Sequence, residues 1–362
     1  MLKLNLWLAC LFLLATTIQG AFDQATITNF DFNLWKEFET KPEIQAFANP
    51  TSFRLPNNTT PIHYSLALRT NVHRGNLSYT GTVRIHIKVL EPSSTITLHA
   101  GSLIRILNVS LYNTNRSSIQ SSVPFERIGP VYDFLIIKAA SELEVDQVLI
   151  ADIRFSANLR TDSVGFFRAA TVVDNSVVLL ASSNFKPVLA RLAFPCYDEI
   201  RYRTSFEIQI QHHRSLHAVS NMPIASVQGV DASDGFVTTY FETTPSMPVY
   251  LVSFTVSNFD FVTNKDPNLE MRVYAQSDAI SNHQADVAIE ISQTMLRAME
   301  KFVNIPYPLP KADQIAVPES WETVEGWGLI TMPESIALLL NNDSWTQNYR
   351  ESEIARQFAV SF

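Results

Sequence analysis

Cysteine is scarce in this chain of 362 residues, which contains only Cys10 and Cys196. Cys10 lies in an N-terminal segment that we expect to be removed, so Cys196 has no partner and an intrachain disulfide is excluded. The neighbours of Cys196 are Pro195 and Tyr197, and no His or Lys adjoins it. We therefore expect a buried thiol that packs as a small hydrophobic side chain, rather than a reactive nucleophile.

The sequence also lacks the short motifs of several enzyme classes. It contains no Gly-x-Ser-x-Gly, no Gly-rich phosphate loop and no Cys-x-x-Cys, so nucleophilic, nucleotide-dependent and thiol-redox chemistry have no support. Runs of Lys and Arg are missing, and the net charge is -8, which argues against a nucleic-acid partner. His213 and His217 have the spacing of a metal pair on a helix. Because they follow a predicted strand and no third ligand is near, we expect a hairpin without metal.

Long apolar runs are missing except near the N-terminus. Lys3 precedes an apolar stretch from Leu6 to Ala15, and small or polar residues continue to Gly20. This pattern predicts a secretory signal peptide at residues 1–20 and a secreted, extracellular protein. The alternative is an uncleaved signal-anchor that holds the protein at the cell surface. The apolar stretch is shorter than the roughly 20 residues that cross a bilayer.

Secretion gives meaning to the Asn-x-Ser/Thr triplets. Each begins at a candidate glycosylation site, and the six are Asn57, Asn58, Asn76, Asn108, Asn115 and Asn342. Because five of them precede position 120, we expect part of the first domain to carry sugar and to face solvent.

Strand-like segments dominate the first part of the chain. After an irregular leader at residues 21–53, Val83, Ile85, Ile87 and Val89 alternate with polar residues, as in a half-buried strand. Similar runs are Ile62–Leu68, Ile104–Leu111, Phe134–Ile137, Val148–Phe155, Val177–Leu180, Phe206–Ile210, Val237–Phe241 and Tyr250–Val256. No helical period interrupts them, so we expect an antiparallel β-sandwich domain over residues 54–258.

Residues 259–362 have a mixed pattern that predicts an α/β domain. A strand at Leu269–Ala275 is followed by helical spacing over Asp278–Val303. Short buried strands are expected at Ile315–Val317 and Gly328–Met332, and a final helix begins at Asp343 or Ser344 and runs to Phe362. On the first helix the expected buried stripe is Val287, Ile291, Met295, Met299 and Phe302.

Two stretches carry a resemblance to a known family. VPESWETVEGWGLITMPES, which contains Trp327-Gly328, resembles the Gly-Ala-Met-Glu-Asn-Trp-Gly signature of the aminopeptidase N family of zinc metallopeptidases. SNFKPVLARLAFPCYDEIRYRTSFEIQI resembles the family's stretch around Ala-Phe-Pro-Cys-Phe-Asp-Glu. The resemblance covers the chain from about Leu55 onward. It implies a β-sandwich followed by a thermolysin-like domain, which we expect to be incomplete here.

The resemblance places the zinc motif in the final helix, where this chain departs from it. His-Glu-x-x-His falls on 356–360, with Arg356 at the first His, Gln357 at the Glu and Val360 at the second His. Arg is permanently cationic, Gln cannot take a proton and Val has no lone pair. The family's third ligand would lie beyond Phe362. We therefore expect no catalytic residue, no metal ligand and no cofactor in this chain, although the family uses zinc.

The substrate-binding positions are altered as well. The signature Glu falls on Glu325, which can pair with a peptide amine, while Asn184 stands where the family has a Gln that helps to hold that amine. Lys186 replaces a nearby Glu. Within the signature, Glu322 replaces Gly and Gly326 replaces Asn. The Asp198–Glu199 pair is expected to be structural.

These observations predict a secreted glycoprotein of the family that has lost catalysis and binds peptides with free N-termini or an extracellular protein. One alternative is a partial product of an active zinc aminopeptidase. Another is an extracellular adhesion or decoy module. The final helix carries Ile354, Phe358 and Phe362 along one side, and we expect this stripe to be exposed and to drive self-association, whereas the β domain cut near Asn258 should fold alone.

Overall fold

The computed structural model describes residues 53–113, 118–129, 131–173, 176–231, 234–264, 266, 269–338 and 344–360. The chain divides into two units, residues 1–53 and 54–362. The expected signal peptide and leader lie outside the described residues, as do Asn115, Asn342 and Phe362.

The first region of the larger unit is built from strands, as the alternation predicts. The strands are β1 (Thr59–Thr70), β2 (Ser78–Val89), β3 (Ser93–His99), β4 (Arg105–Asn113), β5 (Ser118–Gln120), β6 (Phe125–Ile128), β7 (Phe134–Leu143), β8 (Val148–Asn158), β9 (Gly165–Val173), β10 (Ser176–Asn184), β11 (Arg203–His213), β12 (His217–Ser220), β13 (Ile224–Asp231), β14 (Phe236–Phe241), β15 (Met247–Pro248) and β16 (Phe254–Ser257). Short 3-10 turns at Val72–Arg74, Ala190–Leu192 and Val249–Leu251 are the only helical elements described between β1 and β16.

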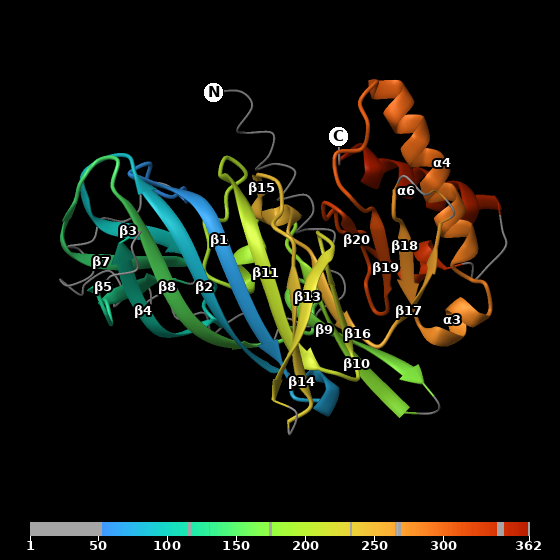
Figure 1. The fold of residues 1–362 in the computed structure, drawn as a ribbon, viewed down its shortest axis with the longest axis horizontal. Coiled ribbons are helices and arrows are strands. Elements are labelled where there is room, and N and C mark those ends of the chain that lie inside the picture. The colour runs from blue at the N-terminus through green and yellow to red at the C-terminus, as the bar shows by residue number, and fades with distance from the viewer. Residues whose placement is uncertain are drawn as a thin grey trace, which may run out of the picture. The chain divides into compact units, whose positions relative to one another are not determined.

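These strands form three sheets. The largest has nine strands in the order β13-β14-β11-β1-β2-β8-β4-β5, with β15 paired to β11 off this path. The second follows β12-β16-β10-β9 and the third β3-β7-β6. Figure 1 shows β11, β1, β2 and β8 running side by side. Most neighbours are antiparallel, but β1 and β11 are parallel. The expectation of a purely antiparallel arrangement is therefore wrong at this pair, because β1 and β11 are distant in sequence and no hairpin joins them.

Strand β2 shows why the alternation is informative. Val83, Ile85, Ile87 and Val89 are all fully buried, while Arg84 between them is exposed. One face of the nine-stranded sheet is thus part of the large apolar core, and the other is polar.

The second region contains a mixed four-stranded sheet with helices. Its strands are β17 (Asp260–Thr263), β18 (Arg272–Ala275), β19 (Asp313–Val317) and β20 (Leu329–Pro333), and its helices are α3 (Ser277–Ser281), α4 (Asp286–Val303), α5 (Glu334–Ala337) and α6 (Ser344–Ala359). Strands β18, β19 and β20 are parallel, and β17 pairs antiparallel to β18. Helices α4 and α6 pack on each other (Figure 1).

Helix α4 confirms the predicted helix, but its buried face coincides only in part with the predicted stripe. The buried side chains are Ala288, Ile289, Ser292 and Leu296, whereas Phe302 is 84% exposed. The buried Ser292 hydroxyl accepts a hydrogen bond from the Gln314 side chain of β19. A polar residue that is hydrogen-bonded in this way does not contribute to a count of apolar spacing. Ile291 and Met295 of the predicted stripe are partly buried against the same core, so the predicted face overlaps the buried face and is not opposite to it.

Helix α6 corrects the expectation of an exposed apolar stripe. Ile354 is 1% exposed and Phe358 is 0% exposed, and both belong to the core beneath α4 and the mixed sheet. Helices α4 and α6 cover each other, so these two side chains are not a surface for self-association. The apolar surface of these two side chains, which we expected to be exposed, is covered within the chain.

A third apolar cluster joins the two regions. Phe167 and Leu180 of the second sheet pack with Ile315, Val317 and Leu329 of the mixed sheet. The boundary near Asn258 stays a prediction, but a cut there would expose the first-region half of this cluster. Among the described residues, no helix is both long enough and apolar enough to traverse a bilayer.

Candidate functional site

The loop from Pro318 to Gly328 connects β19 to β20 and carries Glu325. Two glycines let it lie close against the first region. A Cβ on Gly326 would come within 2.5 Å of the Ser253 Cβ, and one on Gly328 within 2.1 Å of the Asn221 carbonyl oxygen. Gly328 also has a φ of +77°, which other residues rarely adopt. A side chain at position 326, where the resemblance would place an Asn, would therefore clash with its surroundings in this chain.

Buried polar contacts pin this loop on both sides. Asn221 Nδ2 donates to the carbonyl oxygens of Trp327, at 2.7 Å, and Leu251, at 2.8 Å. Lys311 Nζ donates to the Gly328 carbonyl at 2.7 Å and pairs with Asp313 at 2.9 Å. The position of Glu325 is therefore set by surrounding structure.

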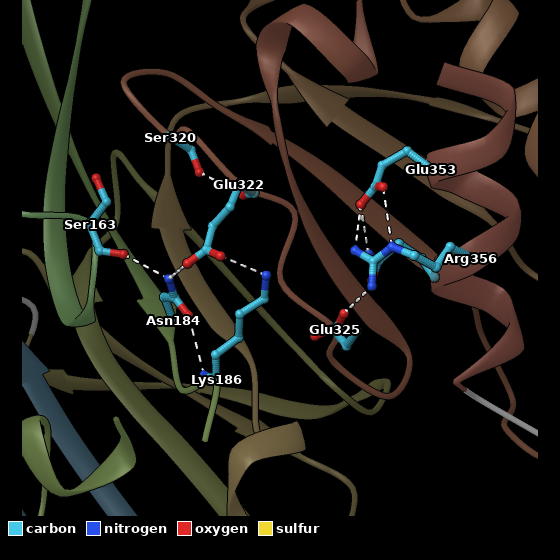
Figure 2. Close-up of polar contacts among 9 residues, drawn as sticks. Ser163, Asn184, Lys186, Ser320, Glu322, Glu325, Glu353 and Arg356 are labelled. Atoms are coloured by element: carbon cyan, nitrogen blue, oxygen red, sulfur yellow. Dashed lines mark hydrogen bonds and ion pairs between the residues drawn. The ribbon is translucent and has the colours of Figure 1, made fainter. Parts of the chain in front are cut away.

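Glu325 is paired with Arg356 of α6. Arg356 Nη1 lies 2.7 Å from Glu325 Oε1, and the Glu325 side chain is 15% exposed whereas that of Arg356 is 49% exposed (Figure 2). The candidate carboxylate for a substrate amine is thus held by a guanidinium of its own chain. The resemblance places the first His of the zinc motif at the position of this guanidinium.

Arg356 also holds the next acidic side chain on its helix. Its Nη2 lies 2.5 Å from Glu353 Oε1 and its Nε lies 3.2 Å from Oε2. Hydrogen bonding from Arg356 holds the pKa of Glu353 below its ordinary value, and the same bond raises the pKa of Arg356. Gln357, which is 1% exposed, donates to Glu353 Oε1 at 3.0 Å. One cation therefore bridges two carboxylates.

These residues do not fit a zinc ion. Arg356 is a cation placed between the only two carboxylates of this cluster, Glu325 and Glu353 (Figure 2). The Gln357 side chain is a neutral amide, and the Val360 side chain has no atom that can coordinate a metal ion. Across the part of the chain that the structure describes, no group of three or more His, Cys, Asp or Glu side chains is arranged to hold a metal ion.

Asn184 belongs to a second, separate cluster. Its Nδ2 donates to the Ser163 carbonyl and to Glu322 Oε1, both at 2.9 Å, and Lys186 Nζ lies 2.6 Å from Glu322 Oε2 (Figure 2). The resemblance expects a Glu at position 186 and a Gly at position 322. In this chain the two positions carry a cation and its anion, and they form an ion pair.

The sequence analysis did not predict the ion pair between Lys186 and Glu322. The two residues are 136 positions apart, and only the opposite change of charge at two altered positions hints at a contact. Between the described side chains of the Glu325 cluster and those of the Asn184 cluster, no hydrogen bond is present. That Glu325 and Asn184 bind an amine stays a prediction, and both now have internal partners.

The candidate glycosylation sites differ in accessibility. Asn57 and Asn76 are exposed, while Asn58 and Asn108 are half-buried. The Asn58 amide donates to Ser93 Oγ at 2.8 Å and to the Thr95 carbonyl at 3.2 Å. An attached sugar would remove one of these donors, so the geometry favours Asn57 over its neighbour.

Three other sequence predictions concern residues away from this region, and two of them agree with the structure. Cys196 is a buried free thiol, and burial raises its pKa well above the ordinary value. Asp198 is buried and accepts hydrogen bonds from the Arg191 side chain and backbone, as a structural residue would. His213 ends β11 and His217 begins β12, but these strands lie in different sheets. The expected hairpin is therefore wrong.

Comparisons with known proteins relate most of the chain to one family. The Peptidase M1 N-terminal domain matches residues 60–251. The chain is 34% identical over 291 residues to endoplasmic reticulum aminopeptidase 1 of Mus musculus, 30% identical over 291 residues to the thyrotropin-releasing hormone-degrading ectoenzyme of Homo sapiens, and 32% identical over 308 residues to aminopeptidase Q of Felis catus. These matches cover 79%, 80% and 81% of this chain but only 30%, 27% and 31% of the respective relatives.

Proposed function

Because this chain belongs to the peptidase M1, or aminopeptidase N, family, we propose that it is a secreted glycoprotein that descends from a peptidase but acts by binding and not by hydrolysis. In this proposal residues 259–362 correspond to part of a thermolysin-like domain. The signal-like N-terminus and the exposed Asn57 and Asn76 triplets support secretion and glycosylation.

One observation carries the proposal of inactivity. The Arg356 guanidinium bonds to both Glu325 and Glu353 at the place where the resemblance puts the zinc motif. A zinc peptidase needs neutral imidazoles for the metal and a carboxylate that takes a proton from water. This cluster supplies a fixed cation and a buried amide.

The internal partners of Glu325 and Asn184 also affect which ligand the chain can bind. A peptide amine would have to displace Arg356 from Glu325, and Asn184 is already bonded to Glu322. Peptides with free N-termini are therefore weak ligands in our proposal, and an extracellular macromolecule is the principal one. The surface that serves it lies elsewhere on the chain.

Zinc content and hydrolysis together test the proposal. The purified full chain should hold no stoichiometric zinc by elemental analysis and should cleave no aminoacyl reporter substrate. The matched variant Arg356→His, Gln357→Glu, Val360→His restores His-Glu-x-x-His and should retain more zinc than the natural chain after desalting. One tightly bound zinc per natural chain would contradict the proposal.

The rival proposal, a partial product of an active zinc aminopeptidase, makes the opposite prediction. Because the chain spans about 30% of the length of its relatives, the activity of any longer product is a separate question. A longer transcript product that carries the same Arg356, Gln357 and Val360 should remain inactive, whereas activity in it would favour the rival.

A further inference from the structure

The polar face of the nine-stranded sheet is hollowed into a groove of about 610 Å³. Its lining comes from six strands, β14, β11, β1, β2, β8 and β4. Six strands spaced by about 4.8 Å give the groove a length of roughly 24 Å across the sheet. It lies in residues 54–258 and uses none of the side chains of the Glu325 or Asn184 clusters.

Strand register shows how the groove is built. Cross-strand pairing sets Tyr240, Gln209, Ala67, Thr82 and Arg154 in one row across five strands. The middle of the row is occupied by the short side chains of Ala67 and Thr82. The longer side chains of Tyr240, Gln209 and Arg154 stand at its two ends, so the sheet surface is depressed between them. Gly81 lines the groove through its backbone, and on the core side of the sheet a Cβ there would meet the buried Phe155 ring within 2.3 Å.

The charge of the lining is opposite to that of the protein. The lining contains Arg69, Arg84 and Arg154 and no carboxylate, although the whole chain has a net charge of -8. Arg84 pairs with Asp152 at 2.7 Å, and Arg69 lies 3.7 Å from Asp234. Arg154 is exposed, and no described carboxylate lies within salt-bridge distance of it. Because carboxylates offset the charges of Arg84 and Arg69, Arg154 is the arginine of this lining that favours an anionic ligand.

The remaining lining indicates the class of anion. Gln209 and Gln211 supply amides, and Thr80, Thr82, Thr238 and Tyr240 supply hydroxyls, so with the three Arg nine of the 14 lining residues have a hydrogen-bonding side chain. Peptides more often add to a free sheet edge or place apolar side chains in pockets. This groove instead crosses the middle of the sheet, and its exposed apolar side chain is Leu107 at one end.

We infer that the groove binds an anionic oligosaccharide, with Arg154 as the main contact for a carboxylate or sulfate group and the Gln and Thr side chains as hydrogen-bond partners for the sugar hydroxyls. Guanidinium groups recognise both anions in bidentate geometry. This inference does not depend on whether the Arg356 region binds zinc, so the two proposals fail independently.

One source of sugar lies on the chain itself. Asn108, a candidate glycosylation site on β4, is paired in register with Arg154 of β8. Neighbouring strands in register direct paired side chains to the same face. A sugar at Asn108 would therefore begin at the β4 end of the groove, and the experiment must separate it from a free ligand.

Titration of the full chain with a heparin-derived tetrasaccharide tests the inference. Binding should be measurable and should weaken as NaCl rises from about 0.05 to 0.3 M. A neutral chitin tetrasaccharide should bind at least about tenfold more weakly, which corresponds to about 1.4 kcal/mol. Tetraglutamate, the probe for a peptide ligand, should also bind more weakly. No detectable binding of the heparin fragment, or equal binding of either of the other two probes, would overturn the inference.

Three variants localise the contact. Arg154→Glu should weaken heparin-fragment binding about tenfold or more, and Arg154→Lys should retain most of it because the charge remains. Arg214→Glu makes the same charge change at an exposed position outside the groove and should change affinity less than about twofold. Equal losses in Arg154→Glu and Arg214→Glu would mean general charge attraction and would overturn the site.

The variant Asn108→Gln cannot carry an N-linked sugar at this position, so it separates an attached sugar from a free oligosaccharide as the occupant of the groove. This variant should bind the heparin fragment at least as tightly as the natural chain. Loss of binding in Asn108→Gln would mean that the attached sugar, and not the arginine-lined groove, recognises the probe. An unchanged melting temperature in each variant separates loss of contact from loss of folding.

Discussion

Arg356 of α6 and Glu325 of the β19–β20 loop form an ion pair at 2.7 Å. The resemblance places the first residue of the zinc motif at Arg356 and the signature Glu at Glu325. Under the proposed function, this one contact therefore puts a cation at the position of a metal ligand and occupies the carboxylate that would hold a substrate amine.

Removal of Arg356 should uncover the amine site. In Arg356→Ala, the Glu325 carboxylate loses its cation, so a peptide with a free N-terminus should bind up to about fivefold more tightly, since a partly exposed ion pair contributes up to about 1 kcal/mol. Calorimetric titration with a short peptide and its N-acetylated form measures the effect. The second substitution Glu325→Gln should abolish the gain, and equal binding of both peptide forms to Arg356→Ala would show that no amine site remains.

The pair Lys186–Glu322 should contribute a measurable coupling energy. Both side chains are partly buried, at 26% and 19% exposure, and their charged atoms lie 2.6 Å apart. A double-mutant cycle with Lys186→Met and Glu322→Gln should give about 1 kcal/mol in the free energy of unfolding. The exposed pair Lys88–Asp146, which also lies within 2.7 Å, is the matched control and should give a smaller value. A coupling no larger than that of the control would mean that the compensation has no energetic effect.

Phe358 should be important for the stability of the second region. Its side chain is fully buried in the core formed by α4, α6 and the mixed sheet. Phe358→Ala should lower the free energy of unfolding by about 3–5 kcal/mol. Ser352→Ala changes an exposed position of the same helix and should alter it by less than about 0.5 kcal/mol. Denaturant titration measures both, and a small loss in Phe358→Ala would place the ring outside a packed core.

Stability should fall in mild acid through His73. Its ring stacks on His213 with centroids 4.3 Å apart, and burial, with the nearby His213 and Arg74, lowers the pKa of His73. The unfolded chain then binds this proton more readily than the folded chain, so stability is lost as the pH falls through the ordinary His pKa of about 6.5. His73→Phe keeps a ring and should lose less stability between about pH 7 and pH 5 than the natural chain. Identical losses, measured by thermal unfolding across this range, would exclude His73 as the source.

Many of the strands and helices could be predicted from the sequence, because they depend on the local spacing of apolar and polar residues. The alternation of Val83, Ile85, Ile87 and Val89 with polar residues specified a strand with one buried face, and the structure contains it. Helix α4 was predicted for the same reason. Strand β3 was not predicted, since its last four residues are all buried and therefore do not alternate.

The sequence by itself determined which chemical groups the chain possesses. No zinc ligand stands at Arg356, Gln357 or Val360, and no fold can supply a lone pair or a proton acceptor that a side chain lacks. The tertiary structure alone decided which groups meet. It joined Glu322 to Lys186, paired Glu325 with Arg356, turned Phe358 into the core and set Arg154 beside Thr82 across two strands. Such contacts depend on strand register and helix rotation, which arise from packing over the whole molecule and leave no period in the sequence.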